Sequence, residues 1–363
     1  MNGSREFVLT DPVEPPLRID GVLGRLVRPL LRDERDIGIV GTALLLVAVV
    51  VVPGIVLFIP GVFRWWLAPV YWFLYIRFVG PYTLMLHCVC HRALFRRGYG
   101  FLNKVVPWVI GPFFGHAPET YYSHHIGMHH VEGNLPGDLS STMKYQRDSF
   151  RDFLRYEADF LFLVIPKLIR YMAARKRWKL ARRVVLGEGF LLLLATTATV
   201  WNPPAGLTVF VVPLLATRFL LMTGNWAQHA FVDPEDPTND YRTVVTFVNS
   251  PYNRRAFNDG YHLTHHLNPS LHYLDMPDDF VARRDEMIRQ DSLVFRRIDY
   301  FMIFLLLMTG QLRRLAGYRV DLDPRNPSST EETIALIRRR VRRFSPEELA
   351  ALGAPSGGDN ADS

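Results

Sequence analysis

The chain has 363 residues and a formal net charge of +7, and 49% of its residues are hydrophobic. Its length would suit two or three soluble domains, but its long uncharged runs argue against the alternative of a large soluble protein with buried helices. The positive charge fits a protein face that rests on anionic lipid, and it requires no nucleic acid partner.

Four stretches are long and apolar enough to cross a bilayer as helices, which takes about 20 residues each. The first carries no charge over 23 positions and contains Pro53, where we expect a kink. Two shorter apolar runs, 105–115 and 301–308, cannot span and are expected to be half-inserted or interfacial. The four predicted spans are 37–59, 66–86, 184–201 and 206–228.

The distribution of positive charge predicts the orientation of these spans. The segment 143–183 contains 12 Lys and Arg residues. The short link between spans one and two contains one basic residue, and the link between spans three and four contains none. By the positive-inside rule, both termini and the middle segment are expected in the cytoplasm. We therefore predict an all-α, four-span helical membrane protein with a cytoplasmic helical cap at 87–183 and 229–300.

This topology implies four regions along the chain. No signal peptide is visible in the polar N-terminal stretch. Arginine outnumbers lysine, which is typical of a bacterial protein, so we expect a multi-pass protein of a bacterial inner membrane. The predicted regions are a cytoplasmic segment at 1–36, the membrane domain at 37–300, interfacial or amphipathic helices at 301–352 and a disordered tail at 353–363.

Ten of the 12 histidines are gathered into four short segments, all of which fall on the predicted cytoplasmic side, while His116 stands apart and His272 follows the last segment. Their i, i+3 and i, i+4 spacings place imidazoles on one face of a helix, and neutral imidazole is a good ligand for iron, zinc or copper. Nine clustered histidines exceed the three or four ligands of a zinc site and favour two metal ions. The clusters are HCVCH (87–91), HHIGMHH (124–130), NWAQH (225–229) and HLTHH (262–266).

The order HxxxH, HxxxHH and HxxHH resembles the three histidine boxes of the membrane fatty-acid desaturase superfamily over roughly residues 65–285. NWAQH is similar to a further element of the acyl-CoA desaturase branch, in which Asn225 would act through water. The first box differs from plant-type members in carrying Cys88 and Cys90, which are expected to be free thiols. The resemblance implies these ligands for a di-metal site: His87, His91, His125, His129, His130, Asn225, His229, His262, His265 and His266.

Further residues near the boxes are expected to hold the ligands in place by accepting an imidazole N–H. The alternative for each is a helix cap, a turn or a packing role. Two arginines inside the predicted spans, Arg77 and Arg218, either line a substrate tunnel or pair with Glu188. The candidates for the supporting role are Asp259, Asn134, Asp138, His124 and His272.

The chemistry implied by the resemblance is O2-dependent oxidation of a fatty acyl chain at two iron ions, with desaturation expected first. The same centre would support hydroxylation or a decarboxylation that forms a terminal alkene. Electrons are expected from a separate ferredoxin, rubredoxin or cytochrome-type donor, for which the basic stretch 167–183 is a candidate dock. A membrane zinc hydrolase and a non-catalytic membrane metal-binding protein remain as alternatives from other classes.

Overall fold

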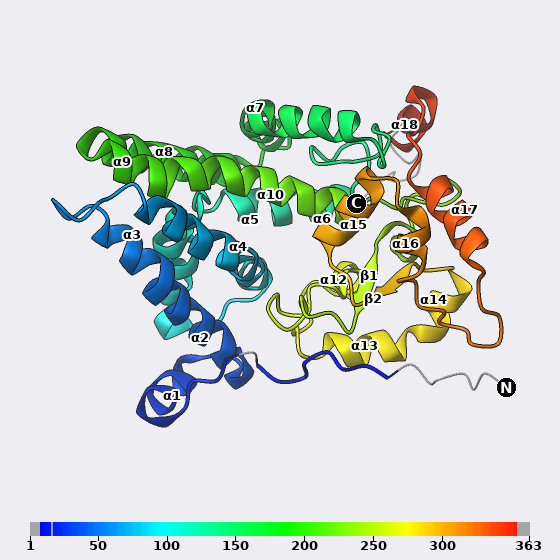
Figure 1. Cartoon of the computed structure of the whole chain (residues 1–363), viewed down its shortest axis with the longest axis horizontal. Coiled ribbons are helices and arrows are strands. Elements are labelled where there is room, and N and C mark those ends of the chain that lie inside the picture. Colours follow the sequence, from blue (N-terminus) through cyan, green and yellow to red (C-terminus); the bar gives the residue numbers. More distant parts are fainter. Residues whose placement is uncertain (1–7, 16, 354–363) are drawn as a thin grey trace, which may run out of the picture.

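A computed structural model describes residues 8–15 and 17–353 of the chain. The described chain is mostly helical, as predicted, and its apolar helices gather on one side of the molecule while a cap with a single strand pair forms the other (Figure 1). The helices up to the end of the last span are α1 (Gly21–Val27), α2 (Ile37–Leu46), α3 (Val52–Val56), α4 (Leu67–His91), α5 (Thr120–His124), α6 (His130–Glu132), α7 (Phe150–Ala174), α8 (Trp178–Trp201), α9 (Pro203–Gly206) and α10 (Val212–Gln228).

The remaining elements form the second part of the cap and the C-terminal helices that follow it. Residues 354–363, which include nearly all of the tail predicted as disordered, lie outside the described residues. The elements are α11 (Asp240–Thr243), β1 (Thr246–Val248), α12 (His262–Leu267), α13 (Met276–Ala282), α14 (Arg284–Arg289), β2 (Val294–Arg296), α15 (Tyr300–Met308), α16 (Leu312–Ala316), α17 (Thr330–Arg340) and α18 (Pro346–Gly353).

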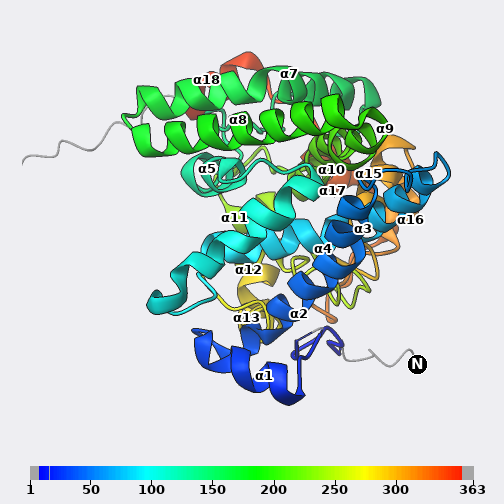
Figure 2. The same ribbon diagram turned by 90° about the vertical axis from the view of Figure 1, so that its left-hand side faces the viewer.

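Four helical stretches of the described chain are long and apolar enough to cross a membrane, which confirms the number of spans predicted. The third begins six residues before its predicted start, because the basic first turns of α8 continue the helix beyond its apolar part. In both views α8 lies beside α7, away from α1 (Figures 1 and 2). The stretches are Glu34–Val56, Leu67–His91, Trp178–Trp201 and Pro203–Gln228.

Two of these spans contain a proline that the helix accommodates by widening. A π-helical turn over Val47–Val51 precedes Pro53, and another over Leu207–Val211 precedes Pro213. Proline has no N–H to donate to the carbonyl four residues earlier, so the helical hydrogen bonds rearrange in the preceding turn. The irregularity predicted at Pro53 is therefore a local widening of the helix.

The cap is organised around the parallel pair of β1 and β2, in which Thr246 lies opposite Val294 and Val248 opposite Arg296. All three residues of β1 are buried. The segment between the two strands carries α12 and therefore the third histidine box. Helix α15 packs against α10, so the cap is joined directly to the last span. Placement of the C-terminal helices at a membrane interface stays a prediction.

Arg147 belongs to the basic middle segment, but it is completely buried. Its guanidinium donates to the carbonyl oxygens of Ala230, Arg340 and Arg342 at 2.9, 2.9 and 2.6 Å. Its backbone N–H donates to the carbonyl oxygen of Val341 at 2.8 Å. One side chain thus ties the C-terminal segment to the chain that follows the second histidine box and to the residue after His229.

Candidate metal centre

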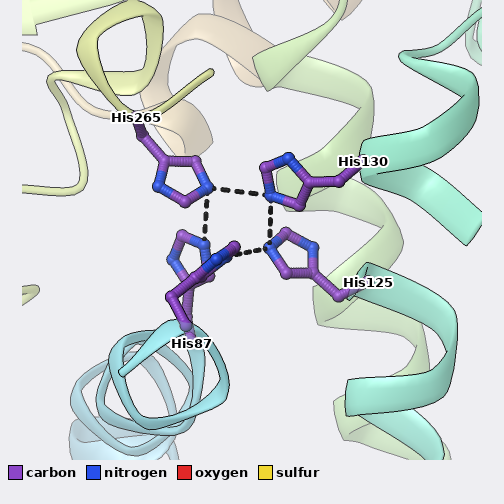
Figure 3. A group of neighbouring side chains, drawn as sticks. His87, His125, His130 and His265 are labelled. Atoms are coloured by element: carbon purple, nitrogen blue, oxygen red, sulfur yellow. Dashed lines mark hydrogen bonds between the residues drawn. The ribbon is translucent and has the colours of Figure 1, made fainter. Parts of the chain in front are cut away.

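Five histidines from distant parts of the chain turn their ring nitrogens toward one another. His87 and His91 come from the end of α4, His125 from the π-helical turn His125–His129, His130 from the start of α6 and His265 from α12. One ring nitrogen of each lies within 4.8 Å of the others. Figure 3 shows four of these rings facing a common centre.

The spacing of these nitrogens is that of metal ligands. The Nε2–Nε2 distances are 3.0 Å for His87–His265 and His91–His125, and 3.1 Å for His125–His130 and His130–His265. A neutral imidazole nitrogen carries either one proton or one lone pair, so it cannot satisfy two such neighbours by hydrogen bonding. Nitrogens bound at right angles, each about 2.1 Å from a metal ion, would lie about 3.0 Å apart.

A second group lies beside the first. Ring nitrogens of His129, His229 and His266 fall within 4.8 Å of one another. His262 joins them, with ring centroids 4.7 Å from His266 and 5.5 Å from His229. Both nitrogens of His262, and Nε2 of His229 and of His266, are buried without a hydrogen-bond partner among the described residues. Orphaned nitrogens of this kind fit a metal ion, because buried polar atoms otherwise find partners.

The second and third boxes each supply both groups. His125 and His130 belong to the first group and His129 to the second, whereas the i, i+4 spacing predicted that His125 and His129 share a face. The π-helical turn over these residues pairs residue i with i+5, which brings His130 onto the face of His125 and so into the first group. In α12, His265 faces the first group and His266 the second, because adjacent helical residues point in different directions.

Three of the imidazoles have a carboxylate next to their Nδ1 atom. Nδ1 of His129 lies 2.7 Å from Asp138 Oδ2, that of His87 lies 3.3 Å from Asp259 Oδ1, and that of His266 lies 3.3 Å from Asp240 Oδ1. A carboxylate at Nδ1 keeps the proton there and leaves Nε2 free to bind a metal. Sequence reasoning missed Asp240, because it lies 26 residues before His266 with no motif around it.

Asp138 is itself firmly held. Its carboxylate accepts from the Ser140 backbone N–H at 2.7 Å and from the Ser140 hydroxyl at 2.6 Å. It also accepts from the Asn134 backbone N–H at 3.1 Å. Burial acts to raise the pKa of Asp138, but His129 and the hydrogen bonds outweigh it, so the net pKa lies below the usual value. Asn134 therefore supports Asp138 and contacts no clustered imidazole directly.

The buried histidines of both groups favour their neutral form. Burial lowers the pKa of His125, His262 and His265 well below the usual value, and neighbouring histidines lower each pKa further. The pKa of His229 is lowered for the same reasons. Neutral imidazole is the form that ligates a metal ion, so the environment prepares these side chains for that task.

Three other predicted residues stand outside the two groups. Asn225 donates from Nδ2 to the Ser140 carbonyl at 3.0 Å and to the Tyr156 hydroxyl at 2.7 Å, and its role as a ligand through water stays a prediction. The ring of His124 packs edge-on against Phe160. His272 lies 3.1 Å from Asp36, so it joins the end of the third box to the N-terminal region.

An apolar cavity of about 470 Å³ opens from the histidine groups into the membrane-spanning region. His87, His125, His129 and His262 line one end, and the rest is lined mainly by hydrophobic side chains of α4, α7 and α10, with polar side chains such as Thr217 among them. Arg218 lies on its wall and pairs with Glu188, and the use of this cavity as a substrate tunnel stays a prediction. Arg77 is different, because it is exposed beside Phe78 and is not among the residues that line the cavity.

Fold and site together define a helical membrane protein with a paired histidine metal site at the end of an apolar cavity. The family described as Fatty acid desaturase matches residues 64–297, and the chain belongs to this family. This confirms the resemblance, and it makes the protein one of fatty-acid oxidation and desaturation. No curated protein matches the chain in a sequence comparison.

Proposed function

We propose that the protein is an O2-dependent di-iron oxidoreductase that introduces a double bond into a fatty acyl chain. The observation that carries this proposal is the pair of adjacent histidine groups at the end of a 470 Å³ apolar cavity. Cavities of roughly 300–1,000 Å³ with a few convergent polar groups are the usual form of small-molecule sites. The family match supports the same class of reaction.

The donor set fits two redox metal ions. His87, His91, His125, His130 and His265 would hold one ion, and His129, His229, His262 and His266, with Asn225 through water, would hold the other. An aliphatic C–H bond has no acidic proton, so side chains alone cannot activate it. Bound iron would supply the reduction of O2 and the removal of hydrogen from carbon, chemistry that belongs to the cofactor.

The chain's own residues would bind and position the substrate. The apolar wall of the cavity excludes water and directs a methylene group toward His87 and His125. Asp138, Asp240 and Asp259 keep the protons of their imidazoles on Nδ1, so that Nε2 faces the metal side. Two hydrogens leave adjacent carbons, and O2 with two electrons and two protons is converted to two waters.

Electrons would come from a separate protein. Between 167 and 183, Lys167 and Arg175 pair with acidic neighbours, but Arg170, Lys176 and Arg182 are exposed. A surface of this charge suits an acidic ferredoxin, rubredoxin or cytochrome-type donor. With the positive-inside rule, it also favours a cytoplasmic orientation of the metal centre in a bacterial inner membrane.

The decisive experiment compares cells that express the wild type with cells that express His265→Ala, each with a donor system supplied. Total fatty acids and headspace hydrocarbons are measured by mass spectrometry, and metals in the purified proteins by elemental analysis. We expect a new unsaturated acid in the wild type alone and about two iron ions per chain. His265→Ala should lose the product entirely, because His265 faces two neighbours in the first group.

Each of the other possible results of this experiment would indicate a different function. A hydroxylated acid or a volatile alkene found only with the wild type would move the assignment to hydroxylation or decarboxylation on the same centre. Zinc in place of iron, with no dependence on O2, would favour a hydrolase. Bound metal without any product, with the donor shown to be active, would favour a non-catalytic metal-binding protein.

A further inference from the structure

A pair of opposite charges lies on the cavity wall far from the histidines. Arg218 Nη2 of α10 and Glu188 Oε2 of α8 are 2.5 Å apart, and the two side chains are 19% and 10% exposed. Both residues line the cavity. Arg218 lies ten residues from the histidine-side end of its span, which is about 15 Å at 1.5 Å per residue. Glu188 follows the basic first turns of α8, and both charges lie within the apolar parts of their spans.

Charges at this depth are expensive, and mutual neutralisation alone would explain the pair. It would not explain why the pair faces the cavity. A guanidinium has five N–H donors, and Glu188 accepts the one hydrogen bond that Arg218 donates among the described residues. Thr120 lines the same cavity, and its hydroxyl is buried without a partner in the described chain. The partly exposed Arg218 guanidinium therefore offers unused N–H donors to whatever fills the cavity.

The polar wall is separated from the metal groups by an apolar stretch. Asn225 follows Arg218 by seven residues on α10, a rise of about 10 Å. Leu221 and Met222 line the cavity between them. A purely hydrocarbon chain would contact this stretch well, but it would leave the donors of Arg218 without an acceptor.

We propose that Arg218, with its charge balanced by Glu188, recognises an oxygen-bearing group on the acyl substrate, about 10 Å along the cavity from the oxidised carbon. This inference rests on the proposed function, since it assumes that the cavity holds the substrate. The required chemistry is a hydrogen-bond acceptor. It could be the carboxylate of a free fatty acid or an oxygen substituent farther along the chain.

Binding without turnover tests the proposal directly. The wild type in lipid nanodiscs is titrated with hexadecane, methyl 16-hydroxyhexadecanoate and hexadecanoic acid, and affinities are measured by competition with a fluorescent fatty acid ester. We expect at least one oxygen-bearing probe to bind about tenfold more tightly than hexadecane, which has no acceptor, because hydrogen bonds to charged groups are worth roughly that factor. The preferred probe identifies which end of the substrate carries the oxygen.

Two variants separate recognition from a structural role. Arg218→Leu combined with Glu188→Leu removes both charges, leaves no orphan charge in the membrane, and should abolish the preference while retaining affinity for hexadecane. Arg77→Leu removes an arginine of α4 that does not line the cavity, and should retain the preference. Equal binding of all three probes, or a preference that survives in the double variant, would overturn the proposal. Selective binding without any oxidised product would instead leave recognition standing and remove the proposed function.

Discussion

Glu157 on α7 is a buried carboxyl group that the proposed reaction does not use. The residue is 7% exposed, and its Oε1 has no hydrogen-bond partner among the described residues. Burial raises the pKa of Glu157 to about 8, because a carboxylate loses its hydration there without gaining a partner. At neutral pH the native protein therefore keeps this side chain protonated.

Protonation of Glu157 makes the stability of the fold depend on pH. Between the ordinary pKa of 4.5 and about 8, the folded protein holds a proton that the unfolded chain has released. The free energy of unfolding should therefore fall as pH rises, by about 1.4 kcal/mol per pH unit for this group. We expect Glu157→Gln to remove this contribution, and so to denature at a higher temperature than the wild type at pH 8 but not at pH 5. Parallel pH profiles of the denaturation midpoint for both proteins would contradict this account.

The metal centre shows which site residues can be predicted from sequence. The histidine spacings identify the ligand candidates because imidazoles are rare and the boxes are short. They do not predict the division of His125 and His129 between two groups, since this depends on a local π-helical turn. Nor do they reveal Asp240, which reaches His266 only through the packing of α11 on α12.

At the scale of elements, a close approach at Gly187 fixes α8 against the turn that leads into the second box. A Cβ atom at this position would lie 1.7 Å from the Pro118 carbonyl oxygen, whereas a Cβ at Gly189 would meet nothing within 4 Å. Both glycines lie inside the same helix. They therefore form a matched pair that differs mainly in contact with Pro118.

We expect Gly187→Ala to separate α8 from the Pro118 turn, lower the denaturation midpoint and reduce the metal content, because α5 and the following π-helical turn carry the second box. Overpacking of this kind costs about 1–3 kcal/mol or more. Gly189→Ala should be neutral or stabilising, since alanine favours helix by up to about 1 kcal/mol over glycine. Equal stability and metal content in the two variants would show that the close approach does not matter.

The membrane-spanning helices were predictable because long uncharged runs have few alternatives to a spanning helix. The pairing of β1 with β2 was not, because each strand has three residues and the partners are almost fifty residues apart. Such short, non-local pairing depends on the surrounding packing, and no local pattern in either strand specifies it.

At the scale of the whole molecule, bound metal would join segments that are far apart in the chain. His87 and His265 are separated by 178 positions, yet their Nε2 atoms are 3.0 Å apart. We expect removal of metal by a chelator to lower the denaturation midpoint, since a ligand at a hundredfold excess over its Kd stabilises by about 2.7 kcal/mol. Restoring iron should reverse the change. His265→Ala should respond less to the chelator, and a wild type that does not respond would exclude a metal that stabilises the fold.

The buried Arg147 has a consequence for the order of events during biosynthesis. Its guanidinium and amide hold the backbone at 340–342, and the Val232 amide donates to the Arg340 carbonyl as well. Translation proceeds from the N-terminus at about 5–20 residues per second, so residues 340–342 leave the ribosome after both of the segments that they hold. The hydrogen bonds that fix the chain behind the second box and beside His229 can therefore form only after all four histidine-bearing segments have been synthesised.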